Sequence, residues 1–201
     1  MVFFERREGN KAMARKNAKP ESRHCATDLL DAGLKLLENE SVQQLTIDSL
    51  CRKLKVTKGS FYHHFRSRAD FLERMLKHWV EVWTLASIET TDKGVDAIER
   101  FNLVVESSHK LPSGTETSIR AWALRDPFAQ KYIERVDRMR IEYLRSIFEE
   151  VSGDSERAKL LSKISYSMFL GVRMMGENVS EEDHSRILKT MKQELYKIPV
   201  K

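Results

Sequence analysis

The sequence is poor in cysteine and proline and has no long apolar segment. Its 201 residues include 2 cysteines, Cys25 and Cys51, and 4 prolines. Two thiols cannot build the disulfide framework of a small secreted domain, so we expect both to be reduced, small and buried on helices. Charged residues follow Met1–Phe4 directly, which is unlike a secretory signal, and no apolar run approaches the length of a membrane span. These absences predict a soluble, cytoplasmic protein.

Signatures of enzymes and metal sites are also missing. The sequence has no Cys-x-x-Cys, His-Glu-x-x-His or Gly-x-Ser-x-Gly motif and no phosphate-binding loop. His63 and His64 are adjacent, so on a helix their side chains point about 100° apart and cannot chelate one metal as an i, i+4 pair does. The sequence therefore predicts no enzyme activity, no metal and no cofactor.

Helical periodicity runs through most of the chain. No segment alternates with the period of two that a strand requires, so we expect an all-α fold. Asp126-Pro127 predicts a helix start, Ser152-Gly153 predicts its end, and Asp92 is expected to cap another helix. From residue 68 onward, helices are expected at about 68–90, 92–109, 115–125, 126–151, 155–177 and 181–197.

Positive charge is concentrated in the first third of the chain. Residues 1–70 hold 14 Lys and Arg against 9 Asp and Glu, whereas residues 71–201 hold 21 of each. Within 41–68, six basic residues accompany one acidic residue, Asp48. A basic segment alone is as compatible with a solvated surface as with nucleic-acid binding, so the local helix pattern has to decide.

Residues 45–71 have the pattern of two short helices joined by a tight turn, followed by the start of a third. Thr46 and Thr57 each stand before a helix and can cap it. Phe61 and Phe65 lie four residues apart and can both point inward, which leaves the polar side chains of the second helix exposed. The pattern predicts a helix-turn-helix whose second helix enters the DNA major groove.

Residues 23–73 resemble the DNA-binding domain of the tetracycline-repressor (TetR) family. The resemblance rests on Lys-Gly-Ser-Phe-Tyr-His-His-Phe at 58–65, the following Ser67-Arg68, Leu-Leu-Asp-Ala at 29–32 and Thr46-Ile47. Lys55 stands where family members usually have glycine, and a left-handed side chain there would cost about 1–2 kcal/mol. The loop after the first helix also often has glycine, and Asn39 is expected to tolerate a left-handed turn.

The resemblance implies two sets of DNA contacts. Thr46, Tyr62, His64 and Arg68 match positions that grip the backbone, and Lys58, Ser60 and His63 project from the recognition helix toward bases. The full set of expected contacts is Thr46, Lys55, Thr57, Lys58, Gly59, Ser60, Tyr62, His63, His64 and Arg68.

The remaining helices carry no comparable signature, but they fit the family's helical effector-binding and dimerisation domain. We expect three parts: a flexible basic arm at 1–20, the helix-turn-helix domain at 21–67 and the helical domain at 68–201. The arm could be a disordered tail or could enter a neighbouring minor groove.

Large aromatic residues of the helical domain could line an effector pocket or form ordinary core. Trp79, Trp83 and Trp122 lie on three consecutive expected helices, and we expect them to surround one cavity. The helix that begins at Ser67 is then expected to be the only direct connection from this pocket to DNA. The candidate pocket residues are Trp79, Trp83, Phe101, Trp122, Tyr143, Phe169 and Arg173.

The last two helices have wide apolar stripes. The pattern alone fits an intramolecular core and a four-helix dimer bundle equally well, and the family resemblance favours the dimer. The expected interface residues are Leu161, Ile164, Met168, Val172, Ile187, Met191 and Leu195. The implied function is a ligand-responsive repressor that binds a pseudo-palindromic operator as a homodimer. Alternatives are an effector-independent, nucleoid-type DNA-binding protein and an all-helical enzyme.

Overall fold

The computed structural model describes residues 25–197, and every regular element in this range is helical, which confirms the predicted all-α fold. The expected arm at 1–20 lies outside the described residues. The α-helices are α1 Ala26–Leu37, α2 Ile47–Leu54, α3 Lys58–His64, α4 Arg68–Val80, α5 Ala86–Thr91, α6 Ala97–Lys110, α7 Ser113–Ala123, α8 Pro127–Ser152, α9 Ser155–Met175 and α10 Glu181–Lys197. Two 3-10 turns, Val42–Gln44 and Gly176–Asn178, and one π turn, Glu81–Leu85, complete this part of the chain.

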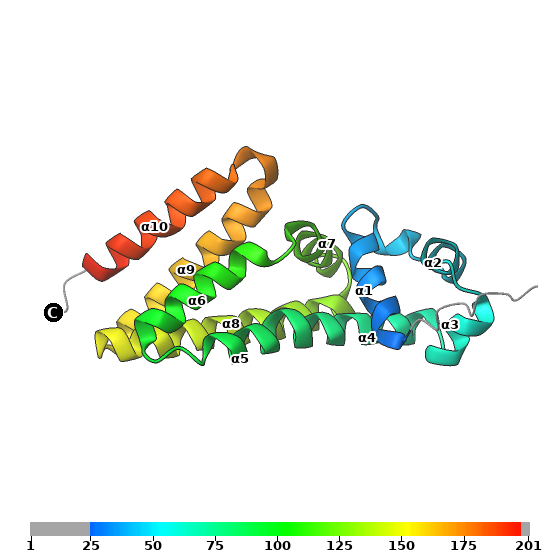
Figure 1. Ribbon diagram of the computed structural model, residues 1–201, viewed down its shortest axis with the longest axis horizontal. Coiled ribbons are helices and arrows are strands. Elements are labelled where there is room, and N and C mark those ends of the chain that lie inside the picture. Colours follow the sequence, from blue (N-terminus) through cyan, green and yellow to red (C-terminus); the bar gives the residue numbers. More distant parts are fainter. Residues whose placement is uncertain (1–24, 198–201) are drawn as a thin grey trace, which may run out of the picture.

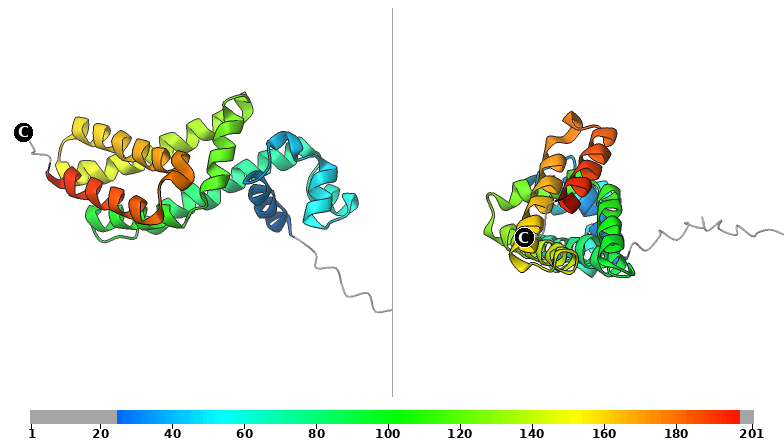
Figure 2. Two further views of the ribbon diagram at one scale, coloured as in Figure 1. Left: turned by 90° about the horizontal axis from the view of Figure 1, so that it is seen from above. Right: turned by 90° about the vertical axis from the view of Figure 1, so that its left-hand side faces the viewer.

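The molecule is elongated, with α1, α2 and α3 at one end and α9 and α10 toward the other (Figure 1). α4, the π turn and α5 follow one another along the long axis, and α8 runs beside them. A view turned by 90° keeps the two ends apart (Figure 2). The segment predicted as one helix from 68 to about 90 is therefore confirmed as helical throughout, with a wider π turn at Glu81–Leu85.

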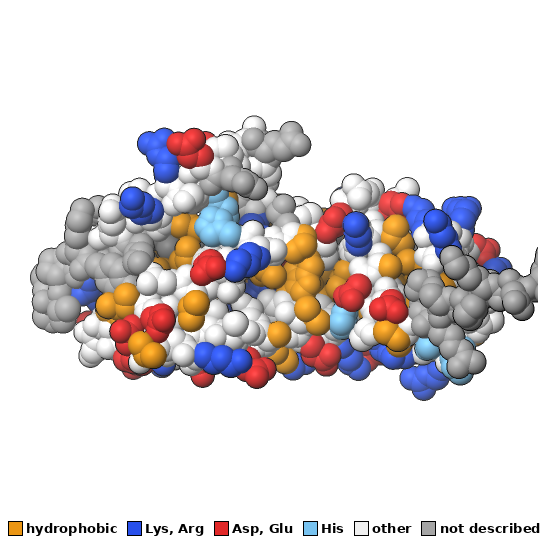
Figure 3. Space-filling model, viewed as in Figure 1, with side chains coloured by type: hydrophobic (Ala, Val, Ile, Leu, Met, Phe, Trp, Pro, Cys, Tyr) orange, Lys and Arg blue, Asp and Glu red, His pale blue; other side chains and the backbone are white. Residues whose placement is uncertain are grey.

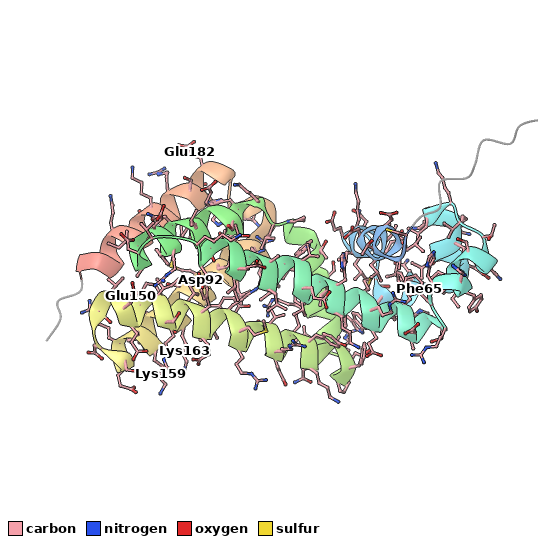
Figure 4. The ribbon with its side chains drawn as sticks, turned by 60° about the horizontal axis from the view of Figure 1, so that its bottom comes forward. Phe65, Asp92, Glu150, Lys159, Lys163 and Glu182 are labelled. Carbon is pink, nitrogen blue, oxygen red and sulfur yellow. The ribbon has the colours of Figure 1, made fainter. Side chains whose placement is uncertain are left out.

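Three phenylalanines form the centre of the N-terminal end. Phe61 and Phe65 of α3 and Phe71 of α4 are fully buried, with ring centroids 5.0–5.5 Å apart. Phe65 lies where α3 meets α4 (Figure 4). Gly33 of α1 allows the close approach of α4, because a Cβ at this position would lie 2.5 Å from Cζ of Phe71 and 3.0 Å from Sδ of Met75. The inward orientation expected for Phe61 and Phe65 is confirmed.

The described residues form two apolar cores. The first joins α1–α4 to α7 and the first half of α8, and it contains Trp79, Ile119 and Val136. The second joins α6, the later part of α8, α9 and α10 around Phe101 and Phe148. Since the first core includes residues on both sides of position 67, the three helices at the N-terminal end pack as one unit with helices that follow.

Local details differ from the expectations at several positions. The cap of α6 is Asp96, whose carboxylate accepts from the amide of Glu99 at 2.7 Å, and not Asp92, which ends α5. Asn39 is not left-handed, because Lys55 is the one non-glycine residue with positive φ in the described range. Cys25 is exposed at the start of α1, whereas Cys51 is buried as expected. No helix within 25–197 has the length and apolar character needed to cross a membrane.

Candidate DNA interface and internal cavity

The turn between α2 and α3 is set by two caps and one left-handed residue. Thr46 Oγ1 accepts from the amide of Ser49 at 3.1 Å, and Thr57 Oγ1 accepts from the amide of Ser60 at 3.0 Å. Lys55 ends α2 with φ 55° and ψ 38°. This is the left-handed conformation expected at a position where members of the resembled family usually have glycine. Because each cap hydroxyl oxygen is the acceptor in these bonds, its own O–H group is left to donate a hydrogen bond to a phosphate oxygen.

The outer face of α3 is polar and open to solvent. The side chain of Tyr62 is 52% exposed, Lys58 and His63 are also exposed, and His64 is half-buried beside His63. Basic side chains are visible at this end of the molecule (Figure 3). The face therefore offers hydroxyl, imidazole and ammonium groups on one short helix.

Lys58 has a partner that the sequence did not indicate. Its Nζ lies 2.6 Å from Oδ1 of Asp48 on α2, and both side chains are exposed. The hydrogen bond and the charge of Asp48 raise the pKa of Lys58. An exposed pair of this kind contributes little to stability, so Lys58 can exchange Asp48 for a base or phosphate at small cost.

Gly59, in the first turn of α3, is not required by packing within the chain. A Cβ there would meet only Oγ1 of Thr57, at 3.7 Å, and the backbone is helical. The bare backbone instead leaves space on the outside of the first turn of α3. This geometry suits the close approach of an external backbone.

Arg68 does not reach toward solvent as a phosphate contact would. Its Nε donates to the carbonyl of Leu45 at 2.6 Å and its Nη2 donates to the carbonyl of Val42. Arg68 thereby fixes the segment that leads into α2. Arg74, which no sequence pattern indicated, similarly holds α3: its Nη1 donates to the carbonyl of His64 at 2.6 Å and its guanidinium lies over the ring of Phe65.

A second candidate site is an internal cavity of about 90 Å³ in the other half of the molecule. Four expected pocket residues, Trp83, Phe101, Tyr143 and Phe169, line it. The other lining residues are Thr84, Ser87, Ile88, Thr91, Val104, Val105, Ser108, Leu111, Arg140, Leu144, Ser165, Tyr166 and Leu188. The cavity wall thus comes from the π turn, α5, α6, α8, α9 and α10.

The proposal that three tryptophans surround one cavity is wrong. Trp79 is fully buried in the first core, and Trp122 packs in the same core while its Nε1 donates to Asp126 at 2.7 Å. Only Trp83 of the three lines the cavity. Arg173 is also outside the lining: its guanidinium donates to the carbonyls of Ser108, Leu111 and Pro112 and so secures the end of α6.

A buried ionic network borders the cavity. The carboxylate of Glu116, whose residue is 1% exposed, accepts from Arg140 Nη1 at 2.8 Å and from Arg120 Nη2 at 2.9 Å. Asp137 Oδ1 accepts from Arg120 at 2.6 Å and from the hydroxyl of Tyr166 at 2.6 Å. Burial raises the pKa of Tyr166, so this hydroxyl stays protonated and donates.

One signal in the sequence could have revealed Arg140. It lies on the buried stripe of α8, four residues after Val136 and four before Leu144, where an apolar side chain is the normal choice. A charge at such a position requires a buried partner, and here the partner is Glu116 of α7.

The expected dimer stripe is partly exposed in the single chain. Ile164 is 41% exposed, and it forms an open groove with Met168, Val172 and Ile187, among others. Leu161 is 5% exposed and packs inside the second core, so the single chain already buries it. Met191 and Leu195 lie on α10, but their side chains are outside what the structure describes.

Comparisons with known proteins agree with this geometry. The family described as bacterial regulatory proteins, tetR family, matches residues 29–75. The transcriptional regulator AcuR of Cereibacter sphaeroides is 36% identical over 52 residues, which are 26% of this chain and 24% of AcuR. The uncharacterized HTH-type transcriptional regulator TtgW of Pseudomonas putida is 34% identical over 64 residues, 32% of this chain and 47% of TtgW. The chain thus spans less than half of either relative.

Solved structures share the fold over most of the chain. The reduced form of Escherichia coli NemR superimposes with a TM-score of 0.70 at 18% identity and covers 84% of this chain and 96% of NemR. A TetR transcriptional regulator from Legionella pneumophila gives a TM-score of 0.69 at 14% identity and covers 89% of this chain and 98% of that protein. At such identities the likeness concerns the fold.

The fold and the outer face of α3 define a helix-turn-helix protein of the DNA-binding class. Within that class, residues 29–75 match the tetR family of bacterial regulatory proteins, and the whole fold resembles that of a TetR transcriptional regulator of known structure.

Proposed function

We propose that this protein is a ligand-responsive transcriptional regulator, a repressor, that binds a pseudo-palindromic operator in the cytoplasm as a homodimer and has no enzymatic activity. The observation that carries the proposal is the outer face of α3, where a capped N-terminus, the bare backbone of Gly59 and exposed Lys58 and Tyr62 stand together. Amides at a helix N-terminus attract phosphate, and the side chains beyond them can reach base edges in the major groove.

Dimerisation would use the open groove of α9 and α10 around Ile164, Met168 and Ile187. An exposed apolar groove on two terminal helices is the surface that a second copy can cover by forming a four-helix bundle. Lys159 and Lys163 of α9 lie far from Phe65 along the molecule (Figure 4), so the proposed interface leaves the α3 end free for DNA.

The effector site would be the internal cavity. Ligand binding there would favour a dimer whose two recognition helices no longer match successive major grooves, about 34 Å apart on B-DNA. Such a shift requires a ligand that binds the DNA-free form more tightly. The assignment of the cavity as the effector site is supported by Arg140, which lies at the cavity wall and contacts both Thr84 of the π turn and Glu116 of α7.

The helix that begins near Ser67 was expected to be the only direct connection from the pocket to DNA. We propose that α7 provides a second connection. Thr115 Oγ1 donates to Oε1 of Glu38, at the end of α1, at 2.8 Å, and the next residue is Glu116. A change at the cavity wall can therefore act on the helix-turn-helix through α4 and through α1.

A titration of the purified protein against a promoter fragment from its own genome and against random DNA of equal length tests the proposal. We expect the promoter fragment to bind at least a hundredfold more tightly, with two chains per site. Equal affinity for both fragments would instead support a nucleoid-type DNA coat and would reject an operator-binding regulator.

A further inference from the structure

Arg140 brings an unsatisfied cation to the wall of the cavity. The side chain is 11% exposed, its Nη1 donates to Glu116 at 2.8 and 3.0 Å, and its Nε donates to Thr84 Oγ1 at 3.2 Å. Its third nitrogen, Nη2, is buried and makes no hydrogen bond of ordinary geometry within the chain, although the hydroxyl of Tyr166 interacts with the guanidinium. The guanidinium also lies between two aromatic rings, 5.9 Å from the centroid of Trp79 and 5.7 Å from that of Phe169.

Ser165 provides a second unsatisfied group on the same cavity. The residue is 6% exposed, lines the cavity from α9, and its Oγ has no hydrogen-bond partner. A buried polar group without a hydrogen-bond partner destabilises the folded chain, so two such groups on one small cavity require an explanation. A ligand that accepts hydrogen bonds from both groups satisfies this requirement.

The charges around the cavity are unbalanced. Arg173 is buried, the side chains of Arg140 and Arg120 are 11% and 16% exposed, and the two carboxylates that pair with Arg140 and Arg120 are Glu116 and Asp137. Burial lowers the pKa of Arg173, which reflects the cost of keeping this charge away from water. One added negative charge would neutralise the cluster.

The rest of the lining is apolar and the space is small. Ile88, Val104, Leu144 and Leu188 contribute aliphatic walls, and Phe101 and Phe169 contribute rings. The volume of about 90 Å³ is below the roughly 150 Å³ of an apolar cavity that accommodates benzene. The space fits a single charged head with a short apolar body.

We propose that the cavity binds a compact monocarboxylate, which accepts hydrogen bonds from Nη2 of Arg140 and Oγ of Ser165 and places its short hydrocarbon part against Phe101, Leu144 and Phe169. The inference rests on the proposed function in one respect, since it names the ligand class of the proposed effector site. A charge-assisted hydrogen bond to a guanidinium is about twice as strong as a neutral one, so the site selects an anion over its neutral isostere.

Calorimetry on the full chain without DNA tests the ligand class. Butyrate, butyramide and butylammonium have nearly equal size and carry one negative, no and one positive charge. We expect butyrate to bind at least tenfold more tightly than butyramide, butylammonium not to bind, and decanoate to bind less tightly than butyrate. Equal or tighter binding of butyramide or butylammonium, or no binding of butyrate at millimolar concentration, overturns the proposal.

Variants locate the binding site. Ser165→Ala should weaken butyrate binding roughly fivefold. The matched control is Ser162→Ala on the same helix, since Ser162 is also buried, donates to the carbonyl of Lys159 at 3.0 Å and does not line the cavity. Arg140→Lys should abolish the preference for butyrate over butyramide, and circular dichroism checks that it folds. If it does not fold, the comparison of Ser165→Ala with Ser162→Ala decides, and equal butyrate affinities in these two variants overturn the site.

Operator release is measured separately. If butyrate binds without releasing operator DNA, the cavity is a carboxylate-binding site but is not the effector site. Operator binding that persists while butyrate fails to bind rejects the carboxylate site and leaves DNA regulation standing.

Discussion

Gly59 separates the demands of folding from those of DNA binding. A methyl group at this position meets no obstacle within the chain, and alanine is preferred over glycine inside a helix by about 0.5–1 kcal/mol. We therefore expect Gly59→Ala to keep or slightly raise the melting temperature while weakening operator binding at least tenfold in fluorescence anisotropy. Gly33→Ala is the converse control, because its Cβ would overlap Phe71 and should cost about 1–3 kcal/mol of stability. Undiminished operator affinity of Gly59→Ala would show that no DNA backbone approaches there.

Lys58 is the strongest candidate for reading a base. Lys58→Ala should weaken operator binding roughly 5- to 150-fold and relax the preference at one base position per half-site. Lys77→Ala is a matched control, since Lys77 of α4 is also exposed and also lies 2.6 Å from its carboxylate partner, Glu73. Selection from randomised sites measures the preference, and an unchanged base preference would make Lys58 a phosphate contact only.

Arg68 was expected to contact phosphate, but in the structure it holds the segment before α2 by hydrogen bonds to two backbone carbonyls. Arg68→Ala leaves the carbonyls of Val42 and Leu45 without their charged donor and should cost about 2 kcal/mol of stability. Arg66→Ala should be nearly neutral, because that side chain is 92% exposed. Denaturant unfolding measures the difference. An unchanged unfolding midpoint, together with a salt slope of DNA binding lowered by about one, would restore the phosphate contact.

At the scale of elements, α7 links the cavity side to the helix-turn-helix side. Thr115→Val keeps the shape of the side chain but removes the donor to Glu38. We expect ligand affinity to stay within twofold, while the coupling between ligand binding and operator release falls by about 1 kcal/mol. Thr90→Val, whose hydroxyl bonds only within its own exposed helical turn, should leave the coupling intact. Unaltered coupling in Thr115→Val would assign the transmission to α4 alone.

The success of the sequence predictions depends on the range of the interactions involved. The caps Thr46, Thr57 and Asp126 could be predicted because each bonds an amide two or three residues away. Asp92 and Asp96 are both plausible caps four residues apart, and neighbouring residues alone do not choose between them. The helix periodicity that located α8 also located its stripe, but not the partner of Arg140.

The wrong assignments concern contacts between distant segments. Arg68 bonds carbonyls 23 and 26 residues earlier in the chain, and no local pattern distinguishes such an arginine from one that faces a phosphate. Trp79 and Trp83 lie one turn apart, but Trp79 enters the first core and Trp83, in the π turn, lines the cavity. The wider turn shifts the faces that a regular α-helix would present, and the sequence carries no clear mark of it.

At the scale of the whole molecule, the groove of α9 and α10 should determine the oligomeric state. Ile164→Glu places a charge in the groove, and a buried unpaired charge strongly disfavours association. We expect this variant to be monomeric in sedimentation equilibrium and to lose operator binding. Leu160→Glu is a close control, because Leu160 is 60% exposed one turn earlier on α9 and lies outside the groove. A dimeric Ile164→Glu would move the interface elsewhere.

The first core has no seam at position 67. Phe61 and Phe65 pack with Phe71, and the same core continues through Trp79 to Ile119 and Val136. A recombinant joined at 67 would combine the first three helices of this chain with the remaining helices of another regulator. It would keep only the part of the first core that precedes position 67. Its new operator specificity would come with mismatched neighbours for every inward-facing phenylalanine. Exchange of operator specificity between such proteins is therefore better achieved by replacing the few outward-facing residues of α3 than by shuffling whole domains.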